Sequence, residues 1–269
     1  MAQVFPVDDP SDERLAPYTR LTDADHRRQV EGRHGTFVIE GVTAIHRALS
    51  SPYELLSVLA TPAKAATLEP DLPDVPLYVA DTAVMEAVVG FDIHRGAVAV
   101  GRRPPPLTVA DVLARGPAVA VLEGLNDHEN LGAIARSAAA LGVTGLLLDP
   151  TCADPLYRRC VRVSMGEVLT LALARVAPWP QTLDTVRAAG FTIVALTPAA
   201  EAEPIDDVAG RVRGRPVALL VGAERHGLSS GALDAADVRA RIAMRPGADS
   251  LNVGHAAAIA FHRLVGPAG

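Results

Sequence analysis

The chain has 269 residues, of which 49% are hydrophobic and 21% charged. This composition is typical of a globular protein with one large or two modest domains. The formal net charge of −6 argues against a protein that coats nucleic acid through charge alone. No apolar run is long and clean enough to span a bilayer, and the N-terminus lacks the basic-then-apolar layout of a signal peptide. We therefore expect a cytoplasmic protein that does not enter a membrane.

Two cysteines, Cys152 and Cys160, are the only thiols of the chain. So few cysteines indicate a reducing compartment without a disulfide framework. Neither cysteine has a metal-ligand partner at a useful spacing, so both are expected in the core and no metal site is predicted.

The first 33 residues are polar and carry few apolar anchors. This pattern predicts an extended or partly helical arm, with a loose tail as the alternative. Arginine is frequent in this segment, and the planar guanidinium binds phosphate bidentately. The arginines of the arm are Arg14, Arg20, Arg27, Arg28 and Arg33.

Residues 34–103 resemble a small α/β domain, because short apolar runs alternate with segments of helical spacing. Strands are expected at 36–39, 55–60, 77–79 and 97–100, and helices at 42–49 and 83–89. Pro104, Pro105 and Pro106 follow, and consecutive prolines continue neither a helix nor a central strand. They mark a domain boundary, with residues 104–117 as the linker.

Residues 118–269 alternate strand and helix patterns and predict a second α/β domain. Continuous apolar strands such as GLLL and VALLV are typical of a parallel sheet buried on both faces. Strands are expected at 118–122, 145–148, 171–176, 191–196, 217–221 and 239–243, and helices at 131–141, 157–169 and 181–189, with a last helix after residue 252.

Ligands of parallel sheets bind at the carboxyl ends of the strands, and three polar clusters occupy such positions. The first runs from Asn126 to Asn130, with Arg136 further along the next helix. The second is GAERHG, with Glu224 between glycines that permit close approach of the backbone to a ligand. We expect these clusters to form one composite site.

The third cluster ends in Ser250, Leu251 and Asn252, directly before an Ala-rich helix. Ser and Asn side chains occupy the free N–H groups of a helix's first turn, and a helix this apolar is expected to be buried. A polar helix entrance at an interior cleft suits a ligand that carries oxygens.

Each cluster also has a structural interpretation. Asn130 can simply cap a helix that starts at Leu131. Glu224 can be a solvated loop residue. Arg136 lies among small residues, where a guanidinium needs a partner or a wet cleft, and this favours function.

Other nucleotide-binding signatures are absent from the sequence. No G-x-G-x-x-G follows the strand AVAVLEG, and there is no phosphate-binding G-x-x-x-x-G-K-[ST]. A nicotinamide fold and a P-loop enzyme are therefore not expected.

Taken in order, the three clusters resemble the three motifs of the SpoU family of SPOUT RNA methyltransferases. The matching stretches are NDHENLGAIARSAAALG, LLVGAERHGLS and IAMRPGADSLNVGHAAA. The stretch YRRCVRVSMGEV is also similar to a family segment, and FVIEGVTAIHRAL resembles the ribosomal-protein-L30e-like domain that precedes many members. The resemblance implies a C-terminal domain with a mostly parallel sheet and a trefoil knot, preceded by a small L30e-like α/β domain.

The resemblance also implies S-adenosylmethionine as methyl donor, a ribose 2′-hydroxyl of RNA as acceptor, and a homodimer. Ribosomal RNA is the preferred substrate and transfer RNA the alternative. The implied catalytic residues are Asn130, Arg136, Glu224, Ser250 and Asn252, and the implied cofactor-binding residues are Gly222, Ile242 and Leu251. Thr197 is a further candidate for the cofactor pocket, and Glu224 is expected to pair with an arginine.

RNA contact is expected from the N-terminal unit, the arm and Arg158, Arg159 and Arg162. Two other functions stay open at this point. One is a non-catalytic RNA-binding protein on the same scaffold, for instance a ribosome-assembly factor. The other is a small-molecule α/β enzyme that uses a different nucleotide.

Overall fold

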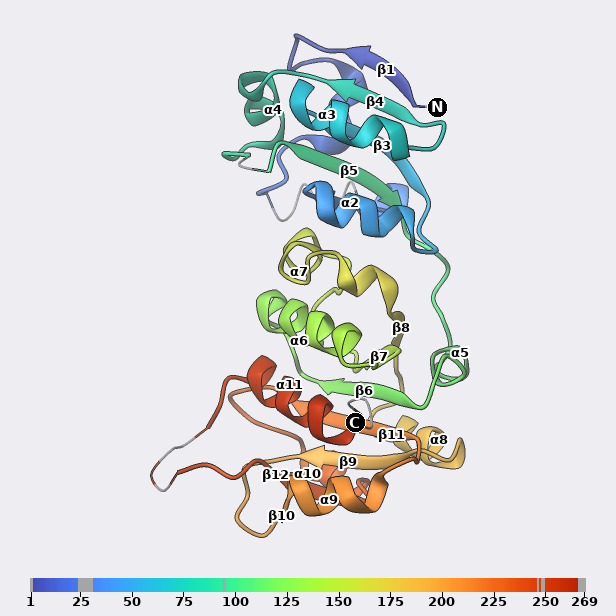
Figure 1. The fold of residues 1–269 in the computed structure, drawn as a ribbon, viewed down its shortest axis with the longest axis vertical. Coiled ribbons are helices and arrows are strands. Elements are labelled where there is room, and N and C mark those ends of the chain that lie inside the picture. The colour runs from blue at the N-terminus through green and yellow to red at the C-terminus, as the bar shows by residue number, and fades with distance from the viewer. Residues whose placement is uncertain (1, 24–30, 94, 246, 248–249, 266–269) are drawn as a thin grey trace. The chain divides into compact units, whose positions relative to one another are not determined.

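The computed structural model describes residues 2–23, 31–93, 95–245, 247 and 250–265. The chain divides into two compact units (Figure 1). The first unit comprises Met1–Pro105 and Leu156–Thr170, and the second comprises Pro106–Pro155 and Leu171–Gly269. The first boundary lies at the three prolines. None of the helices in the described part of the chain has the length and apolar character needed to cross a membrane.

The first unit is built on a five-stranded sheet in the order β1-β4-β3-β5-β2. Strand β4 pairs in parallel with β1 and β3, whereas β5 is antiparallel to β3 and β2. The strands are β1 (Gln3–Pro6), β2 (Thr36–Glu40), β3 (Leu55–Ala60), β4 (Pro76–Val79) and β5 (Ala97–Arg102). The helices up to residue 105 include η1 (Glu13–Tyr18), α2 (Val42–Leu49), α3 (Pro62–Leu68), η2 (Glu69–Asp71) and α4 (Thr82–Val89).

The expectation of an N-terminal arm is wrong for the described residues 2–23. Strand β1 joins the edge of the sheet, and Leu15 and Tyr18 on η1 are fully buried in the core. The Tyr18 hydroxyl lies 2.5 Å from Ser57 Oγ on β3. Burial of these two side chains removes a large apolar area from water, which anchors the segment. Arg27 and Arg28 lie outside the described residues.

Residues 156–170 are not part of the second unit, as the sequence analysis expected, but pack within the first. They form α7 (Arg158–Val163) and η3 (Glu167–Thr170), which contact β2 and α2. The expected single helix over 157–169 is wrong, because Met165 and Gly166 have φ values of 57° and 83°. Gly166 is needed there, since a Cβ would lie 2.8 Å from the Cα of Ala44.

The second unit is a seven-stranded sheet in the order β10-β12-β9-β11-β6-β7-β8, and every neighbouring pair is parallel. This confirms the expected parallel α/β sheet. Its strands are β6 (Ala118–Glu123), β7 (Gly145–Leu148), β8 (Ala172–Arg175), β9 (Thr192–Leu196), β10 (Glu203–Pro204), β11 (Val217–Gly222) and β12 (Val238–Arg241). Its helices are α5 (Val109–Leu113), α6 (His128–Ala140), α8 (Thr182–Ala188), α9 (Ile205–Val212), α10 (Ser230–Asp234) and α11 (Val253–Leu264).

The packing of α11 on α6 positions the polar loops of this unit (Figure 1). Gly254 makes the close approach, since a Cβ on it would lie 3.2 Å from the Cβ of Ala133. The central strands β6, β7 and β11 are buried almost throughout, as their continuous apolar sequences predicted. The trefoil knot and the L30e-like character of the first unit stay predictions.

Candidate active site

Asn252 is the centre of a cluster at the entrance of α11. Its Oδ1 accepts from the backbone N–H groups of Gly254 at 2.9 Å and His255 at 3.3 Å, so it is the N-cap of the helix. Its Nδ2 donates to Asn130 Oδ1 and to Glu224 Oε1, both at 2.9 Å. All four hydrogen-bonding positions of the amide are engaged, which fixes its orientation.

Asn130 is not the cap of α6, so the structural interpretation of this residue is wrong. The helix begins at His128, and Asp127 is its N-cap, accepting from the N–H groups of Glu129 at 2.7 Å and Asn130 at 2.9 Å. The side chain of Asn130 is therefore free to accept from Asn252. Sequence reasoning included Asp127 in the first polar cluster but missed its capping role, although an Asp directly before a helical segment is itself a capping signal.

Glu224 pairs with an amide and a helix N-terminus rather than with the expected arginine. Besides Asn252, its Oε1 accepts from the Val253 N–H at 3.4 Å. A carboxylate at this position interacts favourably with the positive end of the α11 dipole. Within the described ranges no arginine or lysine forms an ion pair with it. We refer to Asn130, Glu224 and Asn252 as the site cluster.

The loop that carries Glu224 folds back tightly on β11. Gly227 N–H donates to the Ala223 carbonyl at 2.8 Å, and the two residues form an isolated β-bridge. A Cβ on Gly222 would lie 2.4 Å from the carbonyl carbon of Gly227, so no side chain fits there. The loop therefore depends on glycine at position 222.

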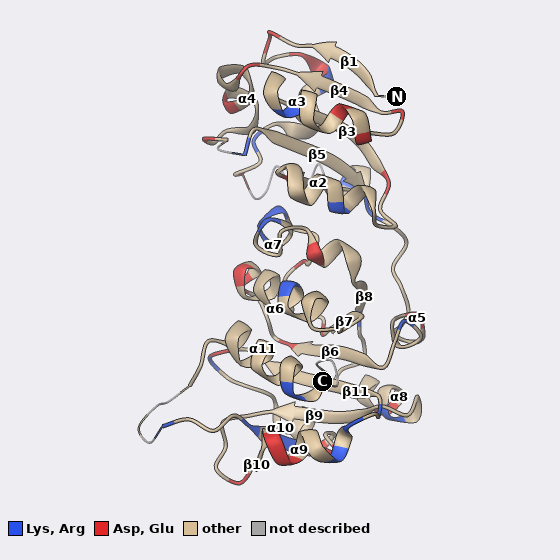
Figure 2. Ribbon diagram, in the orientation of Figure 1, with Lys and Arg blue, Asp and Glu red and all other residues tan. Residues whose placement is uncertain are grey.

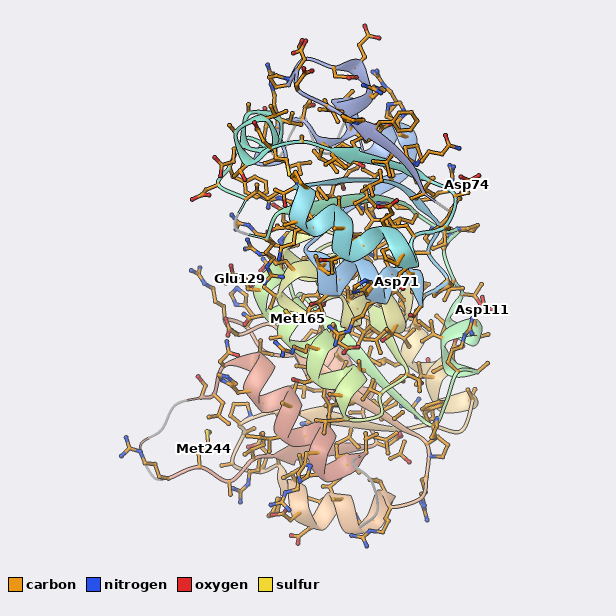
Figure 3. All side chains as sticks on the ribbon, turned by 45° about the horizontal axis from the view of Figure 1, so that its top comes forward. Asp71, Asp74, Asp111, Glu129, Met165 and Met244 are labelled. Atoms are coloured by element: carbon orange, nitrogen blue, oxygen red, sulfur yellow. The ribbon has the colours of Figure 1, made fainter. Side chains whose placement is uncertain are left out.

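A cavity of about 580 Å³ lies beside the site cluster, within the size range of small-molecule sites. The predicted cofactor residues Gly222, Ile242 and Leu251 all line it, as does Thr197. Met244, labelled in Figure 3, lines it from the loop between β12 and α11. Glu224, Ser250 and Asn252 also lie in its wall. The second and third sequence clusters thus meet at one cavity, and Asn130 of the first cluster is linked to its wall by the hydrogen bond from Asn252.

Arg136 does not join the site cluster within one chain. It lies on α6, six residues after Asn130. This spacing places it about 240° around the helix axis from Asn130 and about 9 Å further along the helix. The side chain is exposed and hydrogen-bonds to none of the described residues. Ser250 is likewise exposed, and its hydroxyl bonds to no other residue that the structure describes.

The three arginines expected to contact RNA differ in exposure. Arg158 is 5% exposed, with its Nη1 3.3 Å from Glu40 and its Nε donating to the Leu21 carbonyl at 3.1 Å. Its guanidinium also lies over the ring of Phe91. Burial lowers the pKa of Arg158. The expectation that it binds RNA is wrong.

Arg162 is half-buried and lies 3.8 Å from the other oxygen of Glu40. Arg159 is exposed on the same helix and is the most accessible of the three, so RNA contact by Arg159 and Arg162 stays a prediction. We refer to Glu40, Arg158 and Arg162 as the ion-pair cluster. Figure 2 shows blue segments on α7 that mark its basic residues.

Comparison with known proteins decides the family. The model of the SpoU rRNA methylase family matches residues 117–262, which contain all three clusters. The chain belongs to the SpoU rRNA methylase family. Some of its relatives match 90% or more of the chain and therefore include the first unit.

An uncharacterized tRNA/rRNA methyltransferase of Mycobacterium tuberculosis is 45% identical over 95% of this chain and 90% of its own length. The 23S rRNA (guanosine(2553)-2′-O)-methyltransferase RlmP of Bacillus subtilis is 26% identical over 90% of this chain and 93% of its own. The structure of the SpoU methyltransferase AviRb of Streptomyces viridochromogenes, in complex with AdoMet, is 25% identical. It superimposes with a TM-score of 0.79 and covers 94% of this chain and 98% of that one.

Some residues at the cavity were not predicted from the sequence. Met244 and Leu228 line it, and both lie within the stretches that match the family motifs, although neither was singled out there. No group of His, Cys, Asp and Glu side chains in the described part of the chain is arranged to hold a metal ion.

Proposed function

We propose that this protein transfers a methyl group from S-adenosylmethionine to a ribose 2′-hydroxyl of RNA, preferably ribosomal RNA. The observation that carries the proposal is the side chain of Asn252, which joins Asn130 and Glu224 at the edge of the cavity. Family membership supports the reaction class, and 2′-O specificity is supported by the 23S rRNA 2′-O-methyltransferase among the relatives.

The cavity fits the methyl donor in size and chemistry. Gly222 brings bare backbone to the wall, and Ile242 and Leu251 add apolar surface that suits a flat purine. Glu224 supplies negative charge, which suits a cationic sulfonium. When bound, S-adenosylmethionine supplies an electrophilic methyl carbon, so the protein needs mainly to orient the oxygen that attacks it.

The site cluster has unused polar atoms for that purpose. Asn130 Nδ2 and the second carboxylate oxygen of Glu224 bond to none of the residues described by the structure, and they are a donor and an acceptor respectively. Together they complement a hydroxyl, which both donates and accepts. In this proposal Asn252 fixes the two side chains, and they hold a sugar hydroxyl at the cavity mouth.

Arg136 completes the proposal as a cation beside the reacting hydroxyl. A guanidinium carries a positive charge and only donates hydrogen bonds, so Arg136 stabilises the developing alkoxide while a water molecule takes the hydroxyl proton. Since Arg136 points away from its own site cluster, we propose that it serves the site of the second subunit of a homodimer.

Mixing two inactive variants tests this arrangement. Arg136→Ala and Asn252→Ala subunits are unfolded and refolded together, and methyl transfer from radiolabelled S-adenosylmethionine is measured. If Arg136 acts across the interface, each mixed dimer keeps one intact site, and activity returns to about a quarter of the wild type. If Arg136 acts within its own subunit, both sites of the mixed dimer are damaged and no activity returns.

The substrate is tested by mapping ribose methylation across total RNA from cells with and without the protein. A 2′-O-methyl group of ribosomal RNA that is missing in cells without the protein supports the proposal. If the missing methyl group is in transfer RNA, transfer RNA is the substrate instead. A calorimetric titration with S-adenosylmethionine accompanies the mapping, because a non-catalytic RNA-binding protein needs no methyl donor. Absence of both binding and methylation would reject the enzyme.

A further inference from the structure

Glu123 is a buried carboxylate that the proposed reaction does not use. It is the last residue of β6, is 9% exposed and lies opposite Gly222 in the pairing with β11. Its Oε1 accepts from the indole Nε1–H of Trp179 at 2.6 Å, and its Oε2 accepts from the backbone N–H of Ser229 at 2.8 Å. Neutral donors from two distant segments thus engage both oxygens.

The two donor segments also pack against each other. Trp179 precedes α8 and lies against the core of the second unit, in which Leu228 and Ala232 are buried. Pro180 lies so close to Gly231 that a Cβ on that glycine would be 3.2 Å from the proline ring. Movement of Ser229 would therefore disturb the surroundings of Trp179.

Ser229 ends the loop that forms one wall of the cavity. Leu228 before it and Leu233 after it both line the cavity. The other fixed point of the loop is Glu224, which is bonded to Asn252. The wall is consequently held at two places, at the site cluster and at Glu123.

We propose that Glu123 is a positioning residue for the cofactor cavity, and that its bond to Trp179 makes this indole a reporter of the cavity wall. A wall held in place before the ligand arrives avoids the cost of ordering a loop on binding. Loss of the carboxylate would leave one buried donor without an acceptor and release the wall. This inference rests on the proposed use of S-adenosylmethionine.

The test is Glu123→Gln in the full-length protein. Glutamine has the same shape but one acceptor oxygen, so its NH₂ group faces one of the two N–H donors. We expect the dissociation constant for S-adenosylmethionine to rise about tenfold, with kcat at saturating cofactor within about twofold of the wild type. Trp179 is the only tryptophan of the chain, so its fluorescence emission should shift in the variant.

The matched control is Ser229→Ala. This variant keeps the backbone N–H that binds Glu123 and loses only the hydroxyl that caps α10 by accepting from Ala232 at 3.2 Å. We expect a lower melting temperature with unchanged cofactor affinity. If the control weakens the cofactor as much as Glu123→Gln, general loosening explains the effect and the inference is wrong.

The remaining outcomes also decide the question. Glu123→Gln that binds S-adenosylmethionine as tightly as the wild type overturns the inference. If Glu123→Gln does not fold, Trp179→Phe removes one donor and should raise the dissociation constant about threefold, and unchanged affinity overturns the inference. Failure of the wild type to bind S-adenosylmethionine contradicts the proposed function instead.

Discussion

The site cluster and the ion-pair cluster are each assembled from distant parts of the chain, yet they differ in solvent exposure and charge. In the site cluster, Asn252 and Glu224 are exposed and every bond is made by amides, one carboxylate and backbone N–H groups. In the ion-pair cluster, Arg158 and Glu40 are each 5% exposed and oppositely charged. The site cluster has donors and acceptors that remain available to a ligand. In the ion-pair cluster, the buried charges of Arg158 and Glu40 pair with each other.

The difference shows that an arginine-rich segment does not by itself indicate a nucleic-acid contact. A buried charge is tolerated only with a partner, and removal of that partner is costly. An exposed polar cluster contributes little to stability and its residues are free to act on a ligand. Substitutions in the site cluster should therefore lower activity with little loss of stability. Substitutions in the ion-pair cluster should mainly lower stability.

Arg158→Ala should have the largest effect on stability. It leaves Glu40 buried with only Arg162, 3.8 Å away, and should cost about 3–5 kcal/mol. For a chain of this length the melting temperature should fall by about 10 °C, measured by calorimetry. The double variant Arg158→Met with Glu40→Leu should melt at a higher temperature than Arg158→Met alone. An Arg158→Ala variant that melts like the wild type but binds RNA weakly would restore the RNA-contact interpretation.

Asn252→Ala should have the largest effect on activity. It removes the bonds to Asn130 and Glu224 and should lower methyl transfer about 100-fold, equivalent to about 2.7 kcal/mol. The lost helix cap should cost only about 1 kcal/mol of stability. Asp81→Ala is the matched control, since Asp81 caps α4 by accepting from Val84 N–H at 2.8 Å. Equal loss of activity in both variants would show that Asn252 acts only as a helix cap.

Asp149 is an intermediate case, buried like Glu40 but held by neutral donors. Its carboxylate accepts from Gly124 N–H at 3.1 Å and Cys152 N–H at 2.9 Å. Burial raises its pKa, but hydrogen bonds from Cys152, Gly124 and Thr151 outweigh burial and lower the pKa below its usual value. A depressed pKa stabilises the fold above the unfolded-state value of about 4, and this contribution is lost as the pH falls through the folded-state value.

Asp149→Asn should therefore lower the free energy of unfolding by about 1–3 kcal/mol at pH 7. The gap between variant and wild type should stay constant down to about pH 5 and narrow below about pH 4. Urea unfolding at several pH values measures it. A gap that does not change with pH would show that the charge of Asp149 contributes nothing.

Arg159→Ala should have the smallest effect and provides the exposed counterpart of Arg158 on the same helix. Its stability should stay within about 0.5 kcal/mol of the wild type. If Arg159 contacts a phosphate, the slope of log affinity for RNA against log salt should decrease by about 1. An unchanged slope would show that Arg159 does not contact a phosphate.

The residues of the site cluster could be predicted because each lies after a strand of the predicted parallel sheet. Continuous apolar strands such as 217–221 identify a parallel sheet, and its carboxyl ends lie together whatever the separation in sequence. Strand β7 has the predicted bounds, Gly145–Leu148. The positions of Asn130, Glu224 and Asn252 follow from that rule and from the motif resemblance.

The ion-pair cluster could not be predicted, because Glu40 and Arg158 are 118 residues apart and no local pattern connects them. Strand β1 was missed because four residues at a sheet edge, one of them Pro6, carry no periodicity. Helix α9 was missed although its buried residues Ile205, Val208 and Val212 recur at helical spacing, so its sequence carried the signal. The break after α7 depends on Gly166 packing against Ala44, a tertiary contact.

The inclusion of residues 156–170 in the first unit affects how this protein is made on the ribosome. Domains generally fold as they emerge, starting with the N-terminal one. Here Glu40 cannot pair with Arg158 until that residue, 118 positions later, has been synthesised. At ordinary rates of synthesis this takes about ten seconds. The N-terminal half should consequently stay incompletely folded, and open to proteases and chaperones, until the middle of the second unit has been translated.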